Sequence, residues 1–181
     1  MTALFLPVVP IPKAGLRRDS AGCVCRNKIS RHDPEGRKVV FMKIYIASSA
    51  RNLHGVQLLR DALSERGHQV LDWTALAPPL PDHLSPEERR AALDSDERGE
   101  IFDFCSRACQ ETDLMIYLGP AGQDAACEVG MAFSAGVPVI GLAAPTEKPG
   151  LILGRAVGFW AGDIRACLAR VEQMAQNERQ I

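Results

Sequence analysis

Glu128 is the residue of this chain whose surroundings best fit a chemical role. It lies in the segment Gly-Pro-Ala-Gly-Gln-Asp-Ala-Ala-Cys-Glu-Val-Gly-Met-Ala, residues 119–132, directly after an apolar run at residues 114–118. This order predicts a buried strand, a tight loop and a helix with an acid near its start. In an open parallel sheet, ligands bind at the carboxyl ends of the strands, where such loops lie. A carboxylate there can stabilise the helix end or attack a substrate, and taken alone the first role is the simpler interpretation.

The other residues of this loop are also candidates for contact with a ligand. Gly119 and Gly122 would allow a ligand to approach the backbone closely, and we expect Asp124 to be the N-cap of the helix. Glu128 would then lie near the end of the first turn and point into the crevice. The positive end of the helix would lower the pKa of Glu128 and keep it ionised, as a nucleophile requires.

A second candidate loop follows an apolar strand at residues 43–47. Its side chains Ser48, Ser49, Arg51 and Asn52 offer hydroxyl, guanidinium and amide donors at the start of a helix, which suits a phosphate or a sugar. The glycines of a dinucleotide fingerprint are missing, so that kind of site is not predicted. The alternative is a solvated loop with a serine cap.

Two residues near the end of the next predicted strand could contact the same ligand. Trp73 could stack on a flat ligand, although a tryptophan in this position is also typical of a core. Asp72 could bind ribose hydroxyls, or it could be a solvated acid.

The remaining pattern supplies the elements that must position these loops. Strands are predicted at residues 43–47, 69–73, 114–118 and 137–142, with a further short run at 156–160. Helices are predicted at residues 54–66, 98–111, 124–135 and 163–178, and Ser85-Pro86-Glu87-Glu88 predicts the start of another. Alternation of strands and helices predicts an α/β fold, a flavodoxin-like or Rossmann-like three-layer sandwich with a mostly parallel sheet.

Residues 1–41 differ from the rest of the chain. They mix prolines with scattered basic residues and show neither helical nor strand periodicity. We therefore expect a disordered N-terminal extension at 1–41 and one domain at 42–181. Met42 could begin both the folded domain and the natural translation product; the alternative is a genuine N-terminal arm.

Composition limits the class of protein. The net charge of −1 argues against a nucleic-acid partner, and no apolar stretch approaches the ~20 residues that span a bilayer. The spacing of the six cysteines supports neither a disulfide framework nor a zinc site, so we expect a reduced, cytoplasmic protein.

Three segments together resemble the nucleoside 2-deoxyribosyltransferase family, including its nucleotide N-hydrolase branch. Residues 43–52, Lys-Ile-Tyr-Ile-Ala-Ser-Ser-Ala-Arg-Asn, are similar to the opening strand and loop of the family. Residues 112–117 are similar to its "ADxVV" strand. Residues 124–140, with Glu128, Gly130, Gly136 and Pro138, match its "E-x-G-x-A…G-K-P-V-I" signature.

The resemblance implies a function for these positions. In that family the motif glutamate attacks the anomeric carbon of a nucleoside or nucleotide and forms a glycosyl-enzyme ester, and Glu128 falls on that position. The loop with Ser48, Ser49 and Arg51 matches the region that holds a 5′-phosphate in the hydrolase branch. Such a reaction uses no metal or redox cofactor, and family members form homo-oligomers.

The chain departs from the family pattern at two acids. An acid expected six residues before the glutamate is Gly122 here, and an aspartate expected on the preceding helix is Cys105, with Asp103 two residues away. Asp103 is therefore the candidate that orients Glu128 or assists the leaving base. These departures disfavour efficient base exchange and favour hydrolysis, or nucleotide binding without a reaction.

The sequence thus predicts an enzyme that cleaves or transfers the N-glycosidic bond of a small-molecule nucleoside or nucleotide, with no cofactor, nucleic acid or membrane as partner. A non-catalytic nucleotide-binding module of the same fold is the alternative, and an NAD-cleaving glycohydrolase is a third possibility. The segment Leu151–Ala156 could contribute to contacts between subunits.

Overall fold

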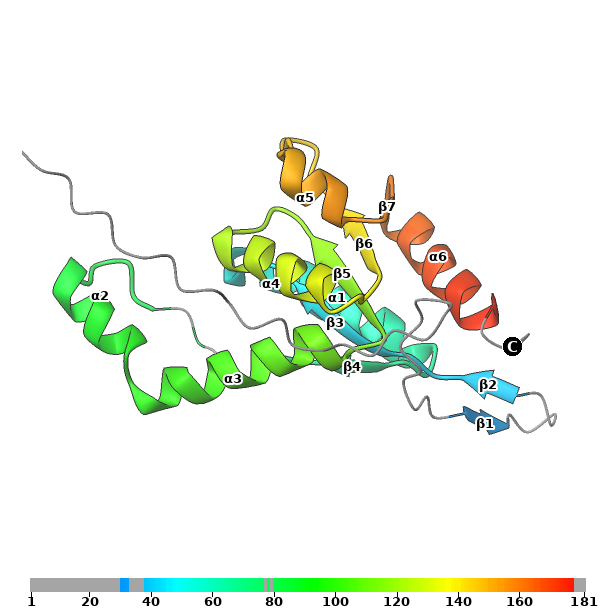
Figure 1. Cartoon of the computed structure of the whole chain (residues 1–181), viewed down its shortest axis with the longest axis horizontal. Coiled ribbons are helices and arrows are strands. Elements are labelled where there is room, and N and C mark those ends of the chain that lie inside the picture. Colours follow the sequence, from blue (N-terminus) through cyan, green and yellow to red (C-terminus); the bar gives the residue numbers. More distant parts are fainter. Residues whose placement is uncertain (1–29, 33–37, 77, 79, 178–181) are drawn as a thin grey trace, which may run out of the picture.

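A five-stranded parallel sheet forms the centre of the computed structural model (Figure 1), which describes residues 30–32, 38–76, 78 and 80–177. Its strands, in the order β4-β3-β5-β6-β7, are Gln69–Leu71, Lys43–Ala47, Leu114–Leu118, Val139–Leu142 and Phe159–Trp160. Every strand pair in this sheet is parallel. Counted along the chain, this is the 2-1-3-4-5 order of flavodoxin-like folds, with the switch point between β3 and β5. The predicted α/β class is confirmed.

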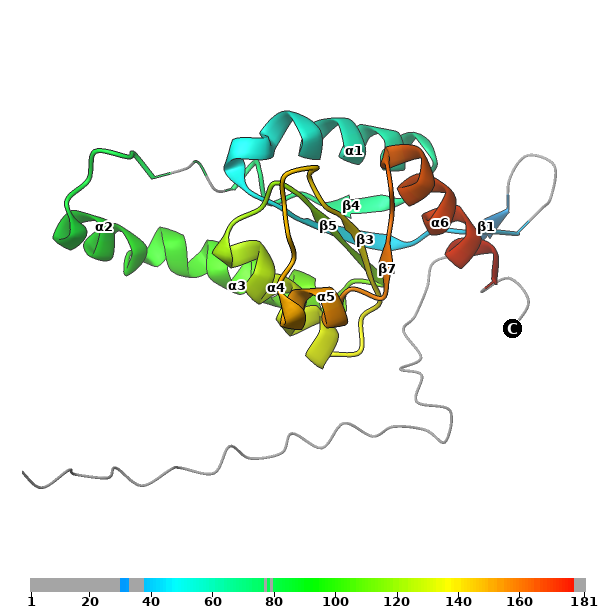
Figure 2. The ribbon, with the colours of Figure 1, turned by 90° about the horizontal axis from the view of Figure 1, so that it is seen from above.

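Helices cover both faces of the sheet and complete three layers. Figure 2 shows α1 (Leu53–Glu65) and α6 (Ile164–Asn177) on one face, and α3 (Asp96–Glu111), α4 (Gln123–Ser134) and α5 (Leu151–Ala156) on the other. The short helix η1 (Ala50–Asn52) precedes α1. The helix α2 (Pro86–Leu93) and the first turns of α3 extend beyond the edge of the sheet (Figure 1).

The sheet forms because its central strands are apolar on both faces. All five residues of β5 are buried, and so are four of the five in β3, as is typical of a parallel sheet covered by helices on both sides. Asp113 fixes the register of these two strands, because its Oδ2 accepts a hydrogen bond of 2.8 Å from the backbone N–H of Lys43. The carboxyl ends of β3 and β5 therefore lie side by side.

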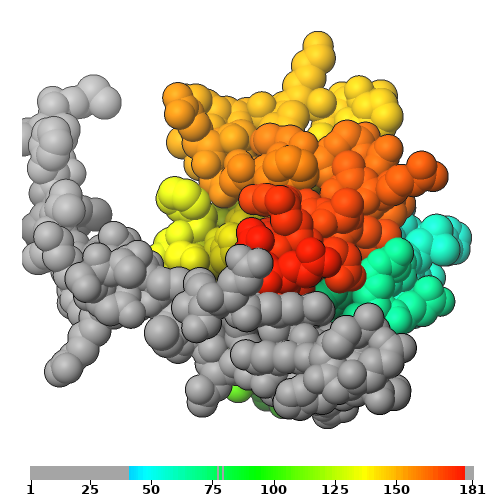
Figure 3. Space-filling model, turned by 90° about the vertical axis from the view of Figure 1, so that its right-hand side faces the viewer, coloured from blue at the N-terminus to red at the C-terminus, as the bar shows by residue number. Residues whose placement is uncertain are grey.

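The helix α6 closes one side of the molecule. Its buried residues Cys167, Val171 and Ala175 recur at intervals of four and face the sheet. In Figure 3, α6 lies in red beside the chain that follows α1, in green, and Glu172 Oε1 is 3.4 Å from Nε2 of the buried His68. Burial lowers the pKa of His68, although Glu172 acts in the opposite direction.

Several predicted boundaries differ from the structure by one to three residues. The strand predicted at 69–73 ends at Leu71, and the one predicted at 137–142 begins at Val139 after Pro138. The helix predicted from residue 98 begins at Asp96, because the Ser95 side chain caps it. The predicted helix start after Ser85 is confirmed, with a complete capping box between Ser85 and Glu88.

The sequence analysis missed one pair of strands. The strands β1 (Ser30–His32) and β2 (Lys38–Val40) pair antiparallel in a small separate sheet. Three-residue strands carry too little periodicity to be predicted from the sequence. Most of the predicted extension at 1–41 lies outside the described residues.

Candidate active site

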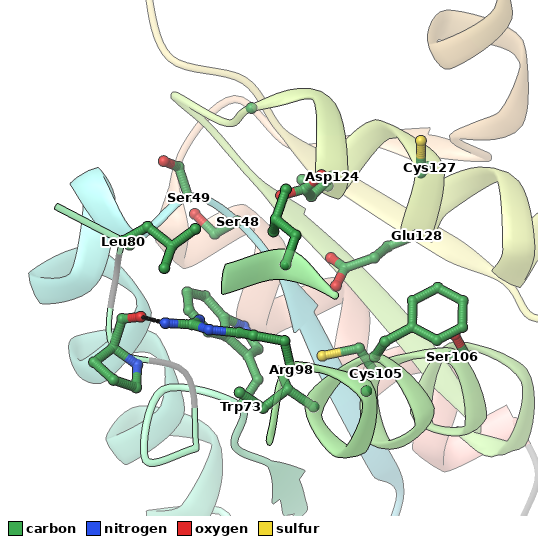
Figure 4. Close-up of a pocket in the computed structure, with 18 of the residues that line it drawn as sticks. Ser48, Ser49, Trp73, Leu80, Arg98, Cys105, Ser106, Asp124, Cys127 and Glu128 are labelled. Carbon is green, nitrogen blue, oxygen red and sulfur yellow. Dashed lines mark hydrogen bonds between the residues drawn. The ribbon is translucent and has the colours of Figure 1, made fainter. Parts of the chain in front are cut away.

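A cavity of about 730 Å³ lies at the carboxyl edge of the sheet, at the switch point between β3 and β5. Its size is within the range of small-molecule sites. The helices α3 and α4 and the loops that follow β3, β4 and β5 contribute its walls. Figure 4 shows the Glu128 carboxylate pointing into this space, with Asp124 on the same helix and Cys105 on α3.

The side chain of Glu128 is held in place by a tyrosine of the sheet. Helix α4 buries Ala125, Val129 and Ala132 against the core, so Glu128 emerges on the neighbouring face towards the cavity. The hydroxyl of Tyr45, a buried residue of β3, donates a hydrogen bond of 2.6 Å to Glu128 Oε1. One carboxylate oxygen is therefore fixed by this bond.

The pKa of Glu128 is raised to about 7, contrary to the expectation from the helix end. Burial is the main cause, the charge of Asp124 acts in the same direction, and the hydrogen bond from Tyr45 opposes them. The helix dipole is weak here because α4 begins at Gln123, which places Glu128 in the second turn. Near neutral pH the carboxyl group therefore exchanges between its acidic and ionised forms.

Tyr45 stays a hydrogen-bond donor throughout this range. Burial and the charge of Glu128 raise the pKa of its hydroxyl far above the usual value. The sequence analysis did not single out Tyr45, because a tyrosine inside an apolar strand is typical of a core.

The helix α3 presents Cys105 to the cavity and turns Asp103 away. The lining residues Ser95, Arg98, Phe102 and Cys105 recur at intervals of three or four, and Ser106 lies four after Phe102, so they form one face of the helix. Asp103 is exposed and does not line the cavity, because residues two apart on a helix point about 200° away from each other. Burial, with the charges of Glu128 and Asp124, raises the pKa of the Cys105 thiol and keeps it neutral.

The loop after β3 uses most of its donors within the protein. Ser48 Oγ donates to Leu118 O (2.6 Å), and Asn52 Nδ2 donates to Ser48 Oγ (3.3 Å) and to Gly119 O (3.0 Å). These bonds fasten the loop after β3 to the loop after β5. Ser48 and Ser49 line the cavity, whereas Asn52 does not, and Arg51 is exposed outside it.

Trp73 packs in the core and also reaches the cavity, so its position is compatible with both interpretations from the sequence. It is 9% exposed and its Nε1 donates a hydrogen bond of 2.9 Å to Ile46 O, yet part of the ring lines the cavity. Asp72 lies outside the cavity wall and binds Arg60 and Thr74. Burial would raise the pKa of Asp72, but the hydrogen bonds from Thr74 and Arg60 lower it below its usual value.

The loop after β5 differs in detail from the prediction. Gly122, not Asp124, is the N-cap of α4, and Asp124 lies in the first turn, exposed on the cavity wall. Gly119 does not line the cavity, and a Cβ there would overlap the carboxylate of Glu147. That carboxylate accepts hydrogen bonds from Tyr117 Oη, Ala121 N and Ala144 N, each of 2.9 Å. It thereby joins the loop after β5 to the loop after β6.

Two arginines complete the cavity and were not proposed from the sequence. Arg89 on α2 and Arg98 on α3 both line it. The sequence pattern at residues 87–98 is typical of a solvated helix face or a lid, and contact with the cavity follows only from the packing of α2 and α3 beside the site. In the described part of the chain, no cluster of His, Cys, Asp and Glu has the arrangement of a metal site. None of the described helices has the length and apolar character needed to cross a membrane.

Comparison with known proteins places the fold. No protein-family model and no curated protein matches the chain. A conserved protein from Enterococcus faecalis V583 matches with a TM-score of 0.52 at 17% identity, over 74% of this chain and 99% of that one. The two chains share a fold.

Two further matching structures have names that describe an activity. One is a 2-deoxyribosyltransferase from Bacillus psychrosaccharolyticus, at 20% identity and a TM-score of 0.48, over 68% of this chain and 88% of that one. The other is the CMP N-glycosidase BcmB from Clostridium botulinum, at 17% identity and a TM-score of 0.47, over 72% of this chain and 98% of that one.

Proposed function

We propose that this protein cleaves or transfers the N-glycosidic bond of a nucleoside or nucleotide, with Glu128 as the nucleophile. The observation that carries the proposal is the position of Glu128: its carboxylate projects into a cavity of ligand size and is held at one oxygen by Tyr45. The motif around Glu128, residues 124–140, supports the same role through its resemblance to the deoxyribosyltransferase family.

The chemistry requires a carboxylate that is ionised but poorly solvated. With Oε1 bound to Tyr45, Oε2 is the oxygen available to attack the anomeric carbon. An oxocarbenium-like transition state is stabilised by a nearby negative charge, and the burial that raises the pKa also strengthens this attraction. The bond to the base breaks as the ester forms, and water or a second base then takes up the sugar.

Protonation of the departing base would need a second group. Asp124 is the other carboxyl group of α4 that lines the cavity, and it lies one helical turn before Glu128. Asp124 is therefore the candidate that contacts the departing base and the solvent that protonates it, in preference to Asp103, which is exposed outside the cavity. The residues at the two family acid positions, Gly122 and Cys105, supply no charge here.

Base release measured by chromatography tests the proposal. Wild type and Glu128→Ala would each be incubated with a panel of nucleosides, nucleotides and NAD, with and without a second free base. Release by wild type and not by the variant supports the proposal, and a new nucleoside formed from the added base indicates transfer. Equal release by both proteins would refute the role of Glu128.

Mass spectrometry of the intact protein provides an independent readout. A 2-fluoro-2-deoxy substrate forms a slowly hydrolysed ester, which would add the mass of the sugar to a peptide that contains Glu128. Tight ligand binding without base release from any substrate would instead favour the alternative, a non-catalytic nucleotide-binding module.

We also propose that the protein is a homo-oligomer. On α5, Leu151 and Ile152 are 75% and 80% exposed, beside the helix that carries Glu128. A second copy of the chain would cover these side chains. Light scattering that gives the mass of one chain would contradict this proposal.

The sequence also predicts a cytoplasmic location, which cell fractionation would test.

A further inference from the structure

Groups of opposite charge line the cavity from different helices. Glu128 and Asp124 come from α4, whereas Arg89 comes from α2 and Arg98 from the first turn of α3. Arg98 and Cys105 are two turns apart on α3, which corresponds to about 10 Å along the helix. Asp94, which follows α2, also lines the cavity and offsets one of the two positive charges.

The two arginines have donors to spare. Arg98 donates one hydrogen bond of 2.8 Å to Pro78 O, and Arg89 donates one of 3.4 Å to Pro81 O. Within the described residues neither guanidinium pairs with a carboxylate or has another acceptor. A guanidinium has five N–H donors, so most of those on Arg98 are free for a ligand. Figure 4 shows the Arg98 side chain among the cavity residues, with its hydrogen bond to the loop after β4 drawn as a dashed line.

We propose that Arg98, assisted by Arg89, binds the phosphate of a nucleotide substrate. This inference rests on the proposed function and adds that the preferred substrate is phosphorylated. A fork of N–H donors matches the oxygens of a phosphate, and a partly enclosed site strengthens the attraction. The charge pattern fits a nucleotide: negative carboxylates face the anomeric carbon, where positive charge develops, and positive guanidiniums face the phosphate.

This assignment differs from the one suggested by the opening loop. Arg51 is exposed outside the cavity, and Ser48 and Asn52 use their donors on Leu118 O and Gly119 O. Arg98 is the partly buried cation that reaches the cavity wall in the described chain. The phosphate would accordingly lie towards α2 and α3 and away from the loop after β3.

Calorimetry in a Glu128→Gln background provides the test, because substrate is then bound and not consumed. The ligands are one nucleoside, its 5′-monophosphate and its 5′-diphosphate. The variants are Arg98→Met, Arg98→Lys and Arg89→Met. Arg90→Met is the matched control, since Arg90 is the next residue of α2 and does not line the cavity.

We expect Arg98→Met to weaken binding of the phosphorylated ligands about 10- to 100-fold and to change nucleoside binding by less than about threefold. Arg98→Lys should restore part of the loss and Arg89→Met should give a smaller one. An unchanged ratio of nucleotide to nucleoside affinity would overturn the proposal. Equal loss for all ligands would also overturn it, because Arg98 would then only fasten the loop at Pro78.

Failure of this inference is separable from failure of the proposed function. If wild type releases base but Arg98→Met keeps its preference for nucleotides, only the phosphate assignment is wrong. If no substrate releases base, inorganic phosphate remains a probe: binding to wild type that is lost in Arg98→Met supports the anion site without the reaction. Phosphate binding that is equal in both proteins would overturn it.

Discussion

Tyrosines on two neighbouring strands of this sheet each hydrogen-bond to a glutamate outside the sheet, and the two pairs have different roles. Tyr45 of β3 donates to Glu128 at 2.6 Å, and Tyr117 of β5 donates to Glu147 at 2.9 Å. Glu147 also accepts two backbone N–H bonds and lies among loops, whereas Glu128 has this one protein donor among the described residues and faces the cavity. A carboxylate whose acceptors are filled by the protein holds structure together. A partly buried carboxylate with an unused oxygen that faces a cavity is available for chemistry.

The largest expected difference between the two pairs is in activity. Glu128→Ala should lower base release by a factor on the order of 10³ or more, because the nucleophile is removed. Glu147→Gln should lower it by less than about tenfold, through the loops that Glu147 holds. Chromatographic rates at matched protein concentration measure both. Similar losses in the two variants would remove the distinction between the pairs.

Glu128 should make a contribution to stability that depends on pH. Its folded-state pKa of about 7 lies above the ordinary 4.5, so the neutral form favours folding and this contribution is lost as pH rises from 4.5 through 7. Glu128→Gln does not titrate. It should therefore be more stable than wild type above pH 7, by up to about 3 kcal/mol, and similar to it near pH 4. Denaturant unfolding at several pH values measures this, and a difference independent of pH would contradict the raised pKa.

The Tyr117–Glu147 pair should affect stability, and a substitution at the neighbouring Gly119 tests this. Gly119→Ala would place a Cβ against the Glu147 carboxylate and the backbone N of Ala144, and it should cost about 2 kcal/mol of stability by displacing the hydrogen bonds between them. Gly122→Ala is the matched control, since a Cβ at that position meets nothing within 4 Å. Thermal unfolding compares the two. Equal melting temperatures would mean that the Glu147 carboxylate can move at little cost.

The smallest expected effect is a shift in the pH profile. We expect kcat/KM to rise with pH through about 7, as Glu128 ionises. The hydrogen bond from Tyr45 lowers the pKa of Glu128, so Tyr45→Phe should move this limb to higher pH and lower the rate on the plateau by about tenfold. Tyr117→Phe should leave the limb in place. A limb that does not move in Tyr45→Phe would mean that another group sets it.

The sequence was sufficient to predict the layers of the fold and the position of Glu128. Continuous apolar strands, capped helices and glycine loops have strong local signals, and the rule that ligands bind at strand carboxyl ends placed Glu128 at the cavity. The partner Tyr45 was missed, because it is 83 residues away from Glu128 and looks like a core residue. The direction of the pKa shift was also wrong, because local reasoning weighs the helix end and does not include burial.

Local reasoning also did not resolve which side of the long helix α3 faces the cavity. Asp103 was favoured because it is an acid close in sequence to the expected position. A displacement of two residues reverses the direction of a helical side chain, so Cys105 reaches the cavity and Asp103 does not. Arg98 lies on the same face of α3 as Cys105. Its contact with the cavity could not be predicted without knowing which side of α3 packs beside α4.

The cavity is lined on one side by residues anchored to the sheet and on another by α2 and the start of α3, and this affects how such a protein can evolve. Glu128 and Tyr45 are anchored by the buried centre of the sheet, where most substitutions would disturb packing. The side chains of α2 and of the first turns of α3 that reach the cavity extend past the sheet and are largely exposed. Mutations there can alter which molecule is accepted at little cost to folding. Descendants of this chain could therefore acquire new substrates by drift in one wall while the reacting centre stays fixed.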